Sequence, residues 1–201
     1  GGPPAIVAGS AIALRELGHD VTVLTLYRLG DKSVAIKTWQ SMLDKGVQIE
    51  FCEEEGLVGL FGFPRQRSRF TNLVVKFDVI HIHGVWSGMF IVLARICRKL
   101  GKPYFVSSHG VFDHRAMKRL KRKYFKKRLA IELFDIRGYL DHASGVVFGS
   151  QAEADESWFP SRNLRVVVVP NGVSSSAGTA EPSAEQLKRL HAVAPAQASW
   201  K

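Results

Sequence analysis

Two histidine–glycine pairs carry the side chains of this sequence that are best suited to chemistry at a ligand site. His83-Gly84 and His109-Gly110 each end a short run of β-branched or aromatic residues. An imidazole can donate a hydrogen bond, accept one, or carry a positive charge after a small change in its pKa. Both histidines are therefore candidates to bind or polarise a hydroxyl or phosphate group. The alternative interpretation is that each one hydrogen-bonds to a loop carbonyl.

The segments that position these histidines form a predicted strand–helix–strand unit. Residues 77–84 and 104–110 are predicted strands, and residues 87–100 between them have a helical pattern that Gly101 and Pro103 end. Such a crossover is right-handed and makes its two strands parallel. His83 and His109 then lie at the carboxyl ends of parallel strands, where open α/β sheets bind their ligands. We expect His81, earlier in the first strand, to be a satisfied core residue covered by helices.

The rest of the chain continues this alternation of strands and helices. Strands are predicted at 21–25, 47–51, 145–149 and 164–169, and helices at 6–17, 34–44, 113–139 and 151–158. Ser150 and Glu153 fit a capping box at the start of the last of these helices. Residues 53–69, with three glycines and a proline, are expected to form a mobile loop or to contain a short helix. The pattern predicts an α/β fold with a doubly wound, Rossmann-like parallel sheet in a single domain.

One strand of that sheet is expected to be missing. Gly1-Gly2-Pro3-Pro4 has the composition of a loop that opens a helix, and such a loop normally follows a central first strand. We expect upstream chain or another segment to fill its place. Gly1 and Gly2 could let a phosphate approach the helix N-terminus, although their spacing matches no standard phosphate-binding motif. A flexible terminus explains them as well.

Composition limits the partners of the chain. Its 201 residues carry a formal net charge of +10, which favours an anionic partner such as nucleic acid, an acidic membrane surface or a phosphorylated substrate. No apolar run reaches the roughly 20 residues that span a bilayer. Cys52 and Cys97 lack metal-ligand spacing and are interpreted as buried thiols of a cytoplasmic protein. The following residues are too scattered to predict a metal site: His83, His109, Asp113 and His114.

The densest basic run lies within the predicted helix 113–139. Residues 115–128 include nine lysines and arginines and no acidic residue. A basic amphipathic helix can lie on an anionic membrane, and the candidate contacts are Lys118, Arg119, Arg122 and Lys126. A solvated helix face is the alternative. Nucleic-acid binding has only the charge in its favour, because no nucleic-acid-binding motif is present.

Taken in order, these motifs resemble the N-terminal half of a GT-B fold glycosyltransferase of the retaining family 4, also called group 1. The matching stretches are Gly1-Gly2, residues 17–23, residues 77–84, residues 108–110, residues 143–150 and residues 169–173. The resemblance implies that Gly1 and Gly2 approach the donor diphosphate, and that His109 is a catalytic-site residue beside the transferred sugar. It places the acceptor or sugar site at His83, Gly84, Gly110 and Asp113. It also likens the basic helix to acceptor-side and membrane-contact elements of members that glycosylate lipid carriers.

The sequence departs from the family pattern at its C-terminal end. In such enzymes a second Rossmann domain binds most of the nucleotide and neutralises the leaving diphosphate, and nothing after Ser174 supplies those groups. We therefore expect residues 1–173 to be a glycosyltransferase N-terminal domain and residues 174–201 to be a linker or tail toward an absent second domain. The chain would be a fragment, a truncated product or one subunit of a split enzyme, with negligible transfer activity alone.

The resemblance thus implies the acceptor-side domain of a glycosyltransferase. It would move a sugar from a nucleotide-sugar donor to a glycan or lipid-linked acceptor in polysaccharide biosynthesis. The expected partners are the donor, the acceptor, a second Rossmann domain or subunit, and an anionic membrane surface. No nucleic acid, metal or cofactor is expected, and the expected location is cytoplasmic, extending to a peripheral place at the inner membrane face. The alternative is a non-catalytic module that docks on a membrane or on a partner domain.

Overall fold

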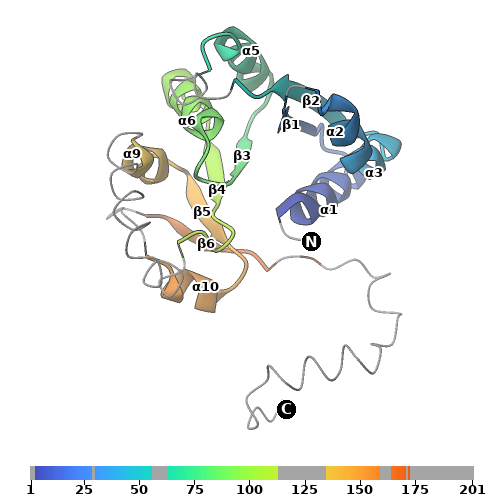
Figure 1. Cartoon of the computed structure of the whole chain (residues 1–201). Helices are drawn as coiled ribbons and strands as arrows, with labels where there is room; N and C mark the ends of the chain where they lie inside the picture. The colour runs from blue at the N-terminus through green and yellow to red at the C-terminus, as the bar shows by residue number, and fades with distance from the viewer. Residues whose placement is uncertain are drawn as a thin grey trace, which may run out of the picture. The chain divides into compact units, whose positions relative to one another are not determined.

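The computed structural model describes residues 3–28, 30–55, 63–112, 135–158, 164–170 and 172. Two groups of parallel strands run through this part of the chain (Figure 1). In the first, β1 (Thr22–Tyr27) pairs with β2 (Gln48–Glu53), and Thr22 lies opposite Gln48. The second has the order β3 (Ile80–His83), β4 (Tyr104–Ser107), β5 (Gly145–Phe148) and β6 (Val166–Val168). Every described pair of strands is parallel, so the predicted α/β class with a Rossmann-like parallel sheet is confirmed.

The described strands form two separate sheets, with β1 in one and β3 in the other. Each of these strands has one paired neighbour among the described strands, β2 for the first and β4 for the second. The six residues of β1 are all half-buried, although a strand inside a parallel sheet is normally covered on both faces. A central first strand between the two groups, supplied by upstream chain or by another segment, stays a prediction.

The strand–helix–strand unit around the two histidine–glycine pairs forms as predicted. Helix α6 (Gly88–Leu100) begins at Ser87, whose hydroxyl accepts a hydrogen bond from the Met89 backbone N–H, 3.3 Å away. The helix ends at Gly101 in the left-handed conformation, with φ of 65°. Seven residues of α6 are buried, and each buried aliphatic side chain contributes about 1.5–3 kcal/mol of transfer free energy. This burial fixes α6 against β3 and β4 and so orients their carboxyl ends.

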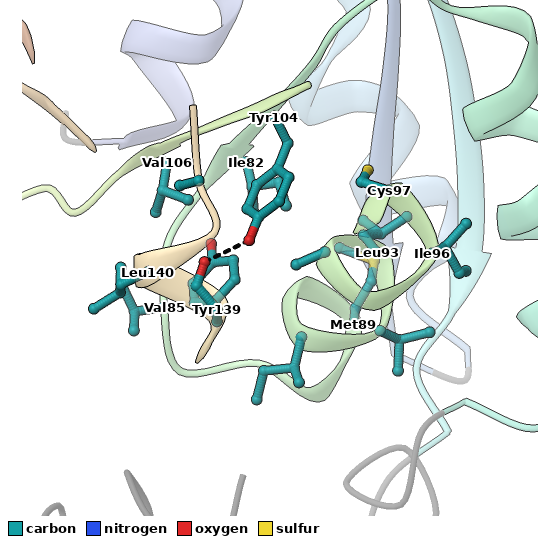
Figure 2. Close-up of a cluster of buried hydrophobic side chains, with 14 of the residues drawn as sticks. Ile82, Val85, Met89, Leu93, Ile96, Cys97, Tyr104, Val106, Tyr139 and Leu140 are labelled. Atoms are coloured by element: carbon teal, nitrogen blue, oxygen red, sulfur yellow. Dashed lines mark hydrogen bonds between the residues drawn. The ribbon is translucent and has the colours of Figure 1, made fainter. Parts of the chain in front are cut away.

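The main core lies around β3, β4, β5 and α6 (Figure 2). Tyr104 and Tyr139 are its largest fully buried side chains. The Tyr104 hydroxyl donates to the Tyr139 carbonyl oxygen at 2.6 Å, the bond drawn in Figure 2, and the Tyr139 hydroxyl donates to the Gly84 carbonyl at 2.8 Å. The two hydroxyls are thereby satisfied inside the core, as buried polar groups must be. The second bond ties the core to the loop that follows His83.

Cys52 and Cys97 are buried and free, as predicted. Burial raises the pKa of the Cys97 thiol to about 11, so the thiol stays protonated and unreactive at neutral pH. Helix α1 (Pro3–Glu16) ends before Gly18, as the sequence indicates. Its Ala11 joins Met42 and Val47 in a small second core.

One helical prediction is corrected, and one alternative left open by the sequence is decided. The helix expected at 34–44 is two helices, α2 (Lys32–Thr38) and α3 (Gln40–Asp44). They are separated at Trp39, whose side chain packs against the small second core. The stretch 53–69 contains the start of a helix that the sequence analysis could not place, α5 (Arg67–Lys76). It buries Phe70 and Val74, one turn apart, and packs on α6.

The C-terminal third is described only in parts. The single long basic helix predicted at 113–139 is corrected at its C-terminal end. Asp135 has φ of 54°, a left-handed conformation that no helix continues through, and a separate helix, α9 (Ile136–Asp141), begins after it. Residues 113–134 lie outside the described residues. Strand β5, helix α10 (Gln151–Glu156) and strand β6 lie within their predicted ranges. The chain divides by its contacts into residues 1–171 and 172–201. Within the described portion, no helix has both the length and the apolar character needed to cross a bilayer.

Candidate functional site

The site lies where β3, β4 and β5 end. His83 is the last residue of β3, and Ser107, the last of β4, lies opposite it in the parallel register. His109 lies two residues after the end of β4. This register follows from the buried alternation of both strands, in which Ile82 and Val106 face the core. The prediction that His83 and His109 share one edge of neighbouring parallel strands is therefore confirmed.

The two imidazoles contact each other directly. Nδ1 of His83 lies 3.1 Å from Nε2 of His109, and the rings stack with their centroids 5.3 Å apart. One nitrogen must donate and the other accept, so at least one ring of the pair is neutral. In either arrangement, the second nitrogen of His109, Nδ1, has no hydrogen bond to any described residue. That nitrogen can donate to, or accept from, a ligand.

A third histidine belongs to the same cluster, which corrects the expectation for His81. Its ring centroid lies 4.1 Å from that of His83, and its Nε2 is 2.9 Å from the hydroxyl oxygen of Ser107. His81 is satisfied as predicted, but it is not a core residue: the residue is exposed, and its hydrogen-bonded ring nitrogen is only partly buried. The reason is that β3 is an edge strand among those described, so one side of His81 has no neighbouring strand. Residues two apart in a strand face the same side of the sheet, so the side chains of His81 and His83 lie next to each other.

The electrostatics of the cluster favour neutral imidazoles. Burial, and then the charges of His81 and His109, lower the pKa of His83 to about 3. Burial lowers the pKa of His109, while the Glu153 carboxylate acts in the opposite direction. The pKa of His81 is lowered by loss of solvent around its ring and then by His109. A neutral pair suits hydrogen bonding to uncharged hydroxyl groups, whereas two adjacent imidazolium ions would repel each other.

The backbone after each strand takes a conformation that makes room at this edge. Gly84 has φ of 133°, and a Cβ there would lie 2.5 Å from a ring carbon of Phe90, so only glycine fits. His109 has φ of 50° and Gly110 has φ of 73°, two successive left-handed residues. A non-glycine residue in this region is uncommon, and strained residues of this kind cluster at functional sites. These two left-handed residues change the direction of the chain after β4, and the His109 ring lies at the carboxyl-end edge of the strands.

A cleft of about 340 Å³ opens beside His109. Its walls come from α1, from the ends of β4, β5 and β6, and from α10, and they include Pro3, Ile6, Gly110 and Glu153. This volume lies at the lower end of the roughly 300–1,000 Å³ of small-molecule sites. A larger hollow of about 690 Å³ lies at the other end of β4, lined by Arg95, Arg98, Lys99 and Lys102. We place the site at the smaller cleft because its lining includes His109, the left-handed Gly110 and the carboxyl ends of the strands.

Several predicted site residues are not described. Gly1, Gly2 and Asp113 lie outside the described residues, as do the candidate membrane contacts Lys118, Arg119, Arg122 and Lys126. Their roles stay predictions. Within the described ranges, His83, Gly84, His109 and Gly110 are brought together, and no group of three or more histidine, cysteine or acidic side chains is arranged to hold a metal ion.

Sequence reasoning missed one residue of the site, Glu153. The capping box was expected to return its carboxylate to the start of α10. The Ser150 hydroxyl does accept from the Glu153 backbone N–H at 3.1 Å, so that half of the box is confirmed. The carboxylate, however, accepts from the Gly149 and Gly110 backbone N–H groups, at 2.8 and 2.9 Å. Its approach to Gly110 depends on the tertiary fold, which no local motif shows.

The chain was compared with known protein families. The model of one family, described as a glycosyl transferase 4-like domain, matches residues 1–172. The match covers both strand groups and every residue of the site described above. No curated protein matches the chain.

Proposed function

The chain belongs to the glycosyl transferase 4-like family, and from that premise we propose that it is the acceptor-side domain of a sugar-nucleotide-dependent glycosyltransferase. The observation that carries this proposal is the hydrogen-bonded His83–His109 pair at the carboxyl ends of β3 and β4, beside a cleft of ligand size. In an α/β sheet, that edge is where small-molecule ligands bind. The substrate class proposed is a nucleotide sugar as donor and a glycan or lipid-linked sugar as acceptor.

In this proposal His109 contacts the transferred sugar. Its ring is held by His83 through Nε2, and Nδ1 is left to bond a sugar hydroxyl. A single well-placed hydrogen bond is worth about 0.5–1.5 kcal/mol net, so His109 orients the sugar more than it holds it. His83 keeps the ring of His109 in one orientation. Retaining transfer also needs stabilisation of the leaving diphosphate, which the family resemblance assigns to a second Rossmann domain.

A binding experiment tests the assignment. The imidazole resonances of the purified chain are followed by NMR during titration with nucleotide sugars of several bases and sugars, and with the free sugars. We expect at least one sugar compound to shift the His109 resonances and to bind more weakly to the His109→Ala variant. A compound that binds without moving His109, or equal binding by parent and variant, would contradict the proposal.

A turnover assay tests whether sugar transfer needs a second domain in addition to this chain. We expect the 201-residue chain alone to release sugar from a nucleotide sugar no faster than its His109→Ala variant. The reason is that one wall of a cleft does not stabilise the leaving diphosphate. Substantial sugar release by the chain alone, lost on substitution of His109, would show that the second domain is not needed.

We also propose peripheral contact with an anionic membrane surface. Its support is the net charge of +10 and the hollow at the end of α6, whose walls include Arg95 and Lys99. Each basic residue near an acidic bilayer contributes about 1 kcal/mol. Flotation with vesicles tests this: we expect binding to vesicles containing acidic phospholipid, none to neutral vesicles, and weaker binding by an Arg95→Glu, Lys99→Glu variant. Binding unaffected by that variant would place the contact elsewhere on the chain.

A further inference from the structure

The carboxylate of Glu153 joins two loops that follow neighbouring strands. Its Oε1 accepts from the backbone N–H of Gly110, at 2.9 Å, and its Oε2 accepts from that of Gly149, at 2.8 Å. Gly110 belongs to the loop after β4, and Gly149 follows β5 directly. The side chain is half-buried, which limits competition from water. Hydrogen bonds from backbone N–H groups to a carboxylate are among the stronger ones in proteins.

This arrangement does more than cap a helix. A cap requires only the bond between the Ser150 hydroxyl and the Glu153 backbone N–H, and that bond is present. The Ser157 hydroxyl further donates to the Glu153 carbonyl, at 2.6 Å, and so helps to fix the main chain at this residue. Because the main chain of Glu153 is fixed, its carboxylate can contact only nearby groups. One of its two oxygens accepts a hydrogen bond from Gly110, the residue immediately after His109.

That residue lies in a backbone that needs support. His109 and Gly110 are both left-handed, and for a residue with a side chain this costs about 1–2 kcal/mol. Such conformations persist where surrounding contacts determine them. Here Glu153 holds the main chain on one side of His109, while His83 holds the ring on the other. Without the first contact, the loop is free to relax and carry the imidazole away from His83.

We propose that Glu153 is a positioning residue for His109, acting by clamping the Gly110 and Gly149 backbone N–H groups to a single carboxylate. The clamp sets the direction of the His109 ring at the cleft and links the loop after β4 to the loop after β5. The role in sugar binding rests on the function proposed above, whereas the clamp itself is a property of the unliganded chain. Glu153 also lines the cleft beside His109.

The electrostatic surroundings give the clamp a measurable signature. Among the residues that the structure describes, the titratable groups facing His109 are His83 and His81 from β3 and Glu153 from α10. Burial lowers the pKa of His109, and the Glu153 carboxylate opposes that shift. Removing the carboxylate charge must therefore move the pKa of His109 further down. A purely structural effect on α10 has no reason to do so.

The first experiment is the Glu153→Gln substitution. An amide of the same size has one acceptor oxygen, so it can satisfy only one of the two glycine N–H groups. We expect the His109 titration, followed by NMR, to move to lower pH. We also expect amide hydrogen exchange at Gly110 or Gly149 to become roughly 10- to 100-fold faster, matching the 1.5–3 kcal/mol of a hydrogen bond to a charged group. An unchanged His109 titration with unchanged exchange at both glycines would overturn the proposal.

The matched control is Ser150→Ala in the same helix. It removes the cap bond to the Glu153 backbone N–H and leaves the carboxylate in place. We expect the His109 titration of this variant to stay at its parental position. A downward shift as large as that of Glu153→Gln would show that helix stability, rather than the clamp, controls His109, and the proposal would fail.

A measurement on the unmodified chain covers the case in which a variant does not fold. The Gly110 and Gly149 amide nitrogens should each show a scalar coupling, through the hydrogen bond, to the Glu153 carboxyl carbon. Coupling to only one glycine, or to neither, would overturn the clamp. Because no ligand is added, this result is independent of the sugar titration. Both couplings, with no effect of any sugar compound on His109, would leave the clamp standing and remove the proposed function.

Discussion

Acid should destabilise the folded chain through His83, and the His83→Gln variant should lose part of that sensitivity. Burial and the neighbouring histidines lower the pKa of His83 to about 3, against about 6.5 for an imidazole in an unfolded chain. Between these values the unfolded chain binds a proton that the folded chain does not. The stabilisation is therefore complete above about pH 6.5 and is lost as the pH falls toward about 3.

The magnitude follows from the two pKa values. At about pH 5, a group titrating at about 6.5 when unfolded and about 3 when folded lowers the free energy of unfolding by roughly 2 kcal/mol relative to about pH 7. The pKa values of His81 and His109 are also lowered, so their contributions have the same sign. The acid sensitivity of the parent chain should accordingly exceed the value calculated for His83 alone.

Urea unfolding at about pH 7 and about pH 5 measures this effect. For each protein, the two free energies of unfolding are subtracted, so that any loss of packing common to both pH values cancels. Carboxylates elsewhere contribute equally to parent and variant. We expect the pH-dependent difference of the parent to exceed that of His83→Gln by roughly 2 kcal/mol. The His19→Gln variant, which removes an exposed imidazole after α1, should retain the parental difference.

The contradicting result is equally specific. If His83→Gln loses as much stability between these pH values as the parent does, then His83 is not held neutral in the folded chain. The neutral imidazole pair on which the proposed sugar contact depends would then be wrong. A loss of acid sensitivity in the His19→Gln variant would instead show that surface histidines account for the pH dependence.

Two further predictions concern the backbone around the site, and urea unfolding measures both. Gly84→Ala should destabilise the chain by more than the roughly 1 kcal/mol expected for Gly110→Ala. The reason is that a Cβ at position 84 would lie 2.5 Å from the Phe90 ring, whereas no described atom lies within 4 Å of a Cβ at position 110. Equal costs would refute the close approach at Gly84. Tyr139→Phe should cost about 1 kcal/mol, because the Gly84 carbonyl loses its donor at 2.8 Å, and an unchanged stability would mean that this bond contributes nothing.

The elements that carry a strong local pattern could be predicted from the sequence. The strand–helix–strand unit around α6 is an example, because a buried helix with a serine at its start and a glycine at its end has a clear signature. Helix α5 had none. It buries two side chains, Phe70 and Val74, and that interval is too short to establish a period. The single helix expected at 34–44 was also wrong, because the packing of Trp39 against the second core outweighs local propensity.

The candidate site could be predicted in outline and not in its contacts. That His83 and His109 share an edge follows from two strand ends and a right-handed crossover. The exposure of His81 does not follow, since it depends on β3 being an edge strand among those described. The target of the Glu153 carboxylate does not follow either. A capping motif shows where the main chain turns, but the N–H of Gly110 is brought to it by the packing of β4 against β5.

The end of β3 and the loops after β4 and β5 are thereby connected by two side-chain contacts. The His83–His109 bond connects the end of β3 to the loop after β4, and the Glu153 clamp connects that loop to the residue after β5. His109 is the only described residue whose ring is held by one contact and whose neighbouring backbone is held by the other. The position of the His109 ring therefore depends on the pairing of β3 with β4 and on that of β4 with β5. A displacement of any of these three strands would also move this ring. A ligand that binds the His109 ring in this position would favour the conformation in which both contacts are formed.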